Sequence, residues 1–149
     1  MAITTAMCTS FKKELLKAIH NFSQTGGDTF KIALIKVSPT GTYGTASTNY
    51  SNITGNSDEV SGAGYTAGGA TLTNVEPTTT GTTAFTDFSP DPTWTSASFS
   101  TSGCMIYNST DSGAACSVHD FGGTQTVSSG TFTAIMPVAD AANAVLRIA

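Results

Sequence analysis

Residues 28–38, with the sequence DTFKIALIKVS, decide the fold of this chain. Successive side chains of a strand point to opposite faces, and here both faces are apolar. One face carries Phe30, Ile32 and Leu34, and the other carries Ala33, Ile35 and Val37. A strand that is apolar on both faces has to be covered on both faces. We therefore predict a buried strand at the centre of a β structure.

A helix is predicted over residues 9–22, directly before this strand. Thr9 or Ser10 can cap its start, and the glycines of SQTGGD end it. Its apolar residues recur at helical spacing, and they are Phe11, Leu15, Ala18, Ile19 and Phe22. Because a helix of this length is not stable alone, we expect its apolar face to cover one side of the strand.

After residue 65 the chain alternates between short apolar segments and turn signals. The predicted strands are residues 65–75, 82–88, 93–101, 104–108, 114–121, 124–136 and 144–148. The segment CMIYN-STDSG-AACSV predicts a hairpin, and Gly130 predicts a bulge or bend in the long strand around it. Spacing of this kind favours a mainly β, antiparallel sandwich or barrel-like domain with one N-terminal helix.

The stretch between these regions, residues 39–64, is polar and rich in Gly, Ser, Asn and Thr. It predicts a long loop, with a short strand near residues 50–53. Long loops in compact domains are often functional, although such a loop can also simply connect the edges of sheets. Both interpretations stay open at this point.

A length of 149 residues suits one domain. We assign residues 1–8 to an extended N-terminal arm and residues 9–149 to a single β-rich domain that includes the helix. The arm is too short to form a core of its own and would expose Ile3 and Met7 to water. We therefore expect it to be ordered against a neighbouring chain.

The net charge of −4 is unevenly distributed along the chain. Residues 1–40 hold all the lysines, whereas most of the acids follow residue 41, so the body cannot supply the phosphate contacts of a nucleic-acid-binding protein. On the helix, Lys12, Lys13 and Lys17 form either a solvated face or a docking surface for an acidic partner or a neighbouring copy. Leu16 on this polar side is either a stray exposed leucine or a second contact point.

The sequence predicts neither membrane insertion nor export. No run of apolar residues is long enough for a transmembrane helix, and the first 20 residues lack the pattern of a signal peptide. We therefore expect Cys8, Cys104 and Cys116 to be reduced, buried thiols. Because Cys104 and Cys116 flank the predicted hairpin, a disulfide between them is conceivable.

No motif for catalysis, cofactor binding or metal binding emerges. The only histidines are isolated: His20 lies on the polar helix face, and His119 precedes Asp120, which points to the opposite side of a strand. The acids sit in or beside turns, and no two of them are brought together as a glycosidase requires. Calcium loops, phosphate loops and nucleophile elbows are absent from the sequence, and the glycines of GAGYTAGGA predict turns and close packing.

The aromatic residues of the predicted strands alternate with Thr, Ser or Ala, which indicates a stripe that faces the core. Tyr43 and Tyr50 differ, because they lie in the polar loop. They are the best candidates for an alternative function, a platform on which sugar rings stack.

Several segments occur in a recognisable order. After the arm and the helix come FKIALIKVS, EVSGAGYTAGGATLTN, the aromatic-rich FTDFSPDPTWTSASF, CMIYNSTDSG and finally DFGG. This order, over nearly the whole chain, resembles small virion structural proteins of tailed bacteriophages, described as head decoration (cement) proteins or as tail- or fibre-associated proteins. The most specific part of the resemblance is EVSGAGY, residues 59–65.

The resemblance implies a non-enzymatic component of a virion, assembled in the bacterial cytoplasm and without active-site residues. A short chain without repeats favours a capsid decoration protein that binds and stabilises the major capsid shell as an oligomer. The alternatives are a tail, baseplate or fibre component and, from another class, a carbohydrate-binding module for host adhesion. The expected interface residues are Ile3, Met7, Lys12, Lys13, Leu16, Lys17, Tyr43 and Tyr50.

Overall fold

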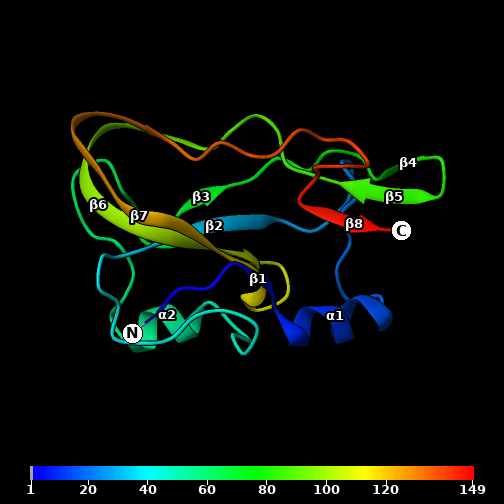
Figure 1. Cartoon of the computed structure of the whole chain (residues 1–149), viewed down its shortest axis with the longest axis horizontal. Helices are drawn as coiled ribbons and strands as arrows, with labels where there is room; N and C mark the ends of the chain where they lie inside the picture. Colours follow the sequence, from blue (N-terminus) through cyan, green and yellow to red (C-terminus); the bar gives the residue numbers. More distant parts are fainter. Residues whose placement is uncertain (1) are drawn as a thin grey trace.

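The computed structural model describes residues 2–149, which form a mainly β structure of two antiparallel sheets and two short helices (Figure 1). The larger sheet has the order β1-β7-β6-β2-β3, with β1 Ala6–Met7, β2 Phe30–Ile35, β3 Ala70–Thr71, β6 Thr93–Asn108 and β7 Ala114–Thr133. The smaller sheet has the order β4-β5-β8, with β4 Thr78–Thr80, β5 Thr83–Thr86 and β8 Leu146–Ile148. The helices are α1 Thr9–Leu16 and α2 Ser51–Gly55.

The strand predicted over residues 28–38 is confirmed as β2, in the interior of the larger sheet. Ile32 and Leu34 on one face and Ala33 and Ile35 on the other are all at most 1% exposed. In the register with β6, Ile32 pairs with Ile106. Both faces of β2 are thus buried, which explains why the strand is apolar on both faces, as predicted.

Two pairs of predicted strands are each one continuous strand. The predicted breaks near Gly103 and at Gly122–Gly123 are wrong, because β6 and β7 stay paired past both positions and absorb the extra residues as a bulge between Thr101 and Gly103. The predicted hairpin turn joins the two strands, and Gly130 pairs with Ala97 between two register shifts, as a bulge requires. Figure 1 shows the β6–β7 ribbon curling back on itself.

Other strand predictions are only partly correct. The segment 65–75 contributes only the short β3, because residues 59–69 are held by side-chain hydrogen bonds and turns. Residues 50–53 lie at the start of α2 and not in a strand. Asn52 Oδ1 accepts hydrogen bonds from the backbone N–H groups of Thr48 and Asn49, which turns the chain at that point.

The first helix is shorter than predicted. It ends at Leu16, and Ala18 takes a left-handed conformation with φ of 56°. The predicted caps are also wrong, since Cys8 occupies the N-cap position without a side-chain cap. Only Phe11 of the helix is buried, and Ile19 is exposed. The chain leaves the helix early because His20 turns inward and is 8% exposed.

The arm belongs to the domain and needs no neighbouring chain to be ordered. Strand β1 pairs with β7, and Thr4 N–H donates to the Tyr43 carbonyl over 2.9 Å. Ile3 and Met7 pack against the core of their own chain, which corrects the expectation that the arm would be ordered against a neighbouring chain. Met1, the first residue of the predicted arm, lies outside the described residues.

All three cysteines are free and buried, as predicted. Burial raises the pKa of Cys8 to about 11 and that of Cys104 to about 12. It also raises the pKa of Cys116.

Within residues 2–149, no helix combines the length and apolar character that a bilayer crossing needs.

Candidate functional site

An apolar groove of about 470 Å³ lies against the larger sheet. Its floor is the larger sheet, and its far wall is the chain that follows β7. We call it the β7 groove, and its principal lining residues are Ile32, Ile106, His119, Phe132, Ile135 and Met136. A second hollow of about 250 Å³ adjoins it and shares Ile106, His119 and Val145. A volume of this size suits a small molecule or a few side chains of a protein partner.

Strand register explains why the floor is apolar. Ile32 pairs with Ile106, and Cys104 pairs with both Leu34 and His119. Directly paired residues lie on the same face of a sheet, so one face collects Ile, Leu, Cys and a single histidine. The floor thus follows from the alternation in β2 that the sequence already shows.

His119 is a polar group of the groove, and it is largely desolvated. Desolvation lowers its pKa, so the ring is neutral near pH 7. Its Nε2 lies 2.9 Å from Ser117 Oγ. Asp120 is exposed and borders a different hollow with Ile3, so alternation separates the histidine from this acid as predicted. The groove therefore offers one neutral imidazole and the polar side chains of Gln125 and Thr133 among apolar side chains, and the Ser117 hydroxyl lies in the adjoining hollow.

Asp58 is a buried carboxylate with a structural role. It accepts hydrogen bonds from the backbone N–H groups of Thr40 (2.8 Å) and Gly41 (2.7 Å) and from the Tyr43 hydroxyl, and it pairs with Lys36. Burial alone would raise the pKa of Asp58, but these hydrogen bonds outweigh it and lower the pKa well below its usual range. Asp58 therefore fixes the loop around residues 40–43.

Glu59 fixes the following loop, around residues 65–68, by hydrogen bonds of its carboxylate. Its Oε1 accepts hydrogen bonds from the Tyr65 hydroxyl (2.8 Å) and the Gly68 N–H (2.7 Å), and its Oε2 accepts one from the Tyr50 hydroxyl. Burial, followed by the hydrogen bond to Glu59, raises the pKa of Tyr50. The motif EVSGAGY thus supplies internal hydrogen bonds in this chain, and its acid does not face a substrate cleft.

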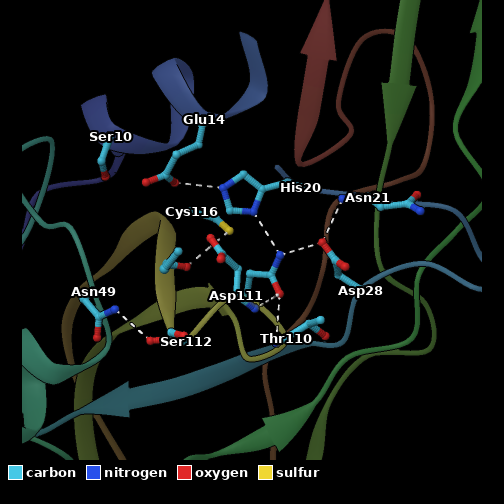
Figure 2. A network of polar contacts seen from close by, with 12 residues as sticks. Ser10, Glu14, His20, Asn21, Asp28, Asn49, Thr110, Asp111, Ser112 and Cys116 are labelled. Carbon is cyan, nitrogen blue, oxygen red and sulfur yellow. Dashed lines mark hydrogen bonds and ion pairs between the residues drawn. The ribbon is translucent and has the colours of Figure 1, made fainter. Parts of the chain in front are cut away.

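His20 belongs to a third network and is not on a polar helix face, as the sequence had suggested (Figure 2). Its Nε2 lies 2.9 Å from Glu14 Oε2, and its Nδ1 lies 3.0 Å from Asn108 Nδ2. The same Asn108 amide donates to Asp28 Oδ2 over 2.8 Å. This network joins α1 to the β6–β7 turn, and every polar side-chain atom buried in residues 2–149 has a partner.

The structure separates the predicted interface residues into two groups. The exposed group lies on or just after α1 and consists of Lys12, Lys13, Leu16 and Lys17. The other group is internal, with Ile3, Met7 and Tyr50 half-buried and Tyr43 only 1% exposed. Tyr43 therefore has no free ring face for a sugar, and the Tyr50 ring stacks on Tyr107 at 4.5 Å.

Sequence reasoning missed the far wall of the groove. Ile135 and Val138 are 83% and 68% exposed, in a segment predicted as the end of a strand and a break. The only available signal was the apolar run from Ala134 to Val138, which does not alternate with polar residues.

Among residues 2–149, no group of three His, Cys, Asp or Glu side chains is placed to hold a metal ion.

Comparisons with protein families, with curated proteins and with solved structures found no match to this chain.

Proposed function

We propose that this protein is a capsid decoration (cement) protein of a tailed bacteriophage, which binds the major capsid shell in many copies and stabilises it. It acts by binding and not by catalysis. In this proposal its two sheets form a β-sandwich that serves as a rigid body, and its place is in the virion. The order of sequence segments described above motivates the virion assignment.

The observation that carries the proposal of a docking protein is the β7 groove together with its exposed rim. Large apolar side chains at 83% and 68% exposure, next to an apolar hollow, are typical of a surface that another protein covers. The one histidine of the groove has a hydroxyl at hydrogen-bonding distance and no carboxylate, which supports binding over acid–base chemistry.

The internal hydrogen bonds support the same role. Asp58 and Glu59 use their carboxylates to fix loops of their own chain. Loops that are already ordered lose little conformational entropy on binding. A particle presents many identical sites, so modest contacts repeated over the shell retain the protein.

Sedimentation with particles tests the proposal. Purified protein is mixed with heads and, separately, with tails of the same phage that lack it, and the pellets are quantified. Binding to heads at hundreds of copies is the expected result. Thr124→Ala, on an exposed part of β7 outside the groove rim, is the control variant and should bind as the wild type does. Binding to tails alone would replace the decoration role with a tail role. Binding to neither would contradict the virion assignment, and a glycan array would then test the adhesion alternative.

A further inference from the structure

The end of α1 carries an apolar side chain among positive charges. Leu16 is 92% exposed at the last residue of the helix. Lys12 and Lys13 lie one turn earlier on the same face, and Lys17 follows directly. No ion pair within residues 2–149 involves these three lysines. We call this surface, Lys12, Lys13, Leu16 and Lys17, the α1 knob.

The rim of the β7 groove combines apolar side chains with negative charges. Ile135 lines the groove and is exposed, and Val138, which is also exposed, directly follows the lining residue Pro137. Asp91 Oδ1 accepts the Met136 N–H over 2.8 Å, which places this carboxylate beside the groove lining. Asp140 lies in the segment between the lining residues Pro137 and Val145. Hydrogen bonds from Asn143 and the backbone of Ala142, together with the nearby Arg147 charge, lower its pKa, so it is ionised at neutral pH. Neither acid is in an ion pair within the part of the chain that the structure describes.

The two surfaces are complementary in charge and alike in apolar character, yet they are built from opposite ends of the chain. An α1 knob cannot pair with a second α1 knob, because lysines from both copies would then face one another. The same holds for two groove rims with their acids. We infer that the α1 knob of one copy docks into the β7 groove of a second copy of this chain.

Such a contact is heterologous: each copy uses one surface to bind the next copy and a different surface to be bound. Contacts of this type produce rings or open chains and do not stop at a symmetric dimer. Leu16 would leave water for the apolar groove, and the lysines would set the association rate and its dependence on salt. The inference rests on the proposed function in one respect, because it names a second copy of this chain as the protein that covers the β7 groove.

A complementation experiment tests the inference by sedimentation velocity. Leu16→Asp removes the knob and leaves the groove intact, whereas Ile135→Asp damages the groove and leaves the knob intact. Both side chains are more than four-fifths exposed, so both variants should fold, which circular dichroism checks. If Ile135→Asp does not fold, Pro137→Asp, at another exposed residue of the groove lining, takes its place. Ile148→Asp, at an apolar residue 62% exposed outside both surfaces, is the matched control.

The wild-type chain and Ile148→Asp should form species larger than a dimer as concentration rises. Each of the other variants alone should associate roughly tenfold more weakly or worse. An equimolar mixture of the two should form a 1:1 heterodimer and nothing larger, since only one intact knob and one intact groove can meet. A mixture that stays monomeric, or a wild-type chain that is monomeric at every concentration, overturns the inference. Binding of the wild-type chain to phage heads is measured separately by sedimentation, so a failure of the contact between copies is distinguishable from a failure of the proposed function.

Discussion

The orientation of the Asn108 side-chain amide determines which ring nitrogen of His20 carries the proton. Asn108 Oδ1 accepts the backbone N–H groups of Thr110 and Asp111 at 3.0 and 3.1 Å, so its Nδ2 has to face His20 and Asp28. An amide nitrogen only donates, and His20 Nδ1 therefore has to accept. We assign His20 to the neutral form with its proton on Nε2, from which it donates to Glu14 (Figure 2).

Replacement of Asn108 by Ala should lower the free energy of unfolding by about 2–4 kcal/mol, because the buried His20 Nδ1 and the N–H groups of Thr110 and Asp111 all lose this partner. Ser109→Ala, at the exposed neighbouring residue, should cost about 1 kcal/mol or less. Urea denaturation measures both values.

Nitrogen-15 NMR of the wild type near pH 7.5 should show the Nε2–H tautomer of His20. A charged ring, or a proton on Nδ1, would contradict the assignment.

This network also shows what the sequence could and could not predict. The alternation of apolar residues in β2 is a local pattern, and it correctly indicated a buried strand. The early end of α1 accompanies the inward turn of His20, whose partner Asn108 lies 88 positions further along the chain, and no local pattern reveals such a contact. For the same reason the sequence predicted the hairpin turn of β6 and β7 but not their unbroken pairing, and it did not reveal the groove that forms between distant segments.

Asp58→Asn should make stability less dependent on pH. The pKa of Asp58 is lowered in the folded protein, so its carboxylate stabilises the fold above its unfolded pKa of about 4 and loses this effect as the pH falls further. The variant should therefore be less stable at pH 7 by about 2 kcal/mol, a value reduced because Lys36 reaches solvent. The difference should shrink towards pH 3. A difference that grows on acidification would show that the hydrogen bonds of Asp58 favour its protonated form.

Gly69→Ala should destabilise the protein strongly. Gly122→Ala should destabilise it less, only by the strain of placing alanine at a positive φ. Both glycines have a φ of 74°, but a Cβ atom on Gly69 would lie 1.8 Å from the Ile32 carbonyl oxygen and one on Gly122 would meet nothing within 4 Å. The pair therefore separates steric overlap with β2 from backbone strain. Thermal unfolding compares them, and equal melting temperatures would disprove the close approach.

The thiols should react slowly in the folded protein. Burial raises the pKa of Cys8 to about 11, which leaves little thiolate at pH 8. Iodoacetamide under native conditions should therefore modify few cysteines within minutes, while denaturation without a reductant should give three modified cysteines by mass spectrometry. A mass lower by two hydrogens with two unmodified cysteines would reveal a disulfide and contradict the structure.

The copy number of the protein in purified particles tests the central claim most directly. Quantitative peptide mass spectrometry of the virions, with the major capsid protein as the internal reference, measures it without any change to the chain. Our account predicts hundreds of copies, which stay with the heads when heads and tails are separated. A handful of copies that follow the tails, or no copies in the particle, would contradict it.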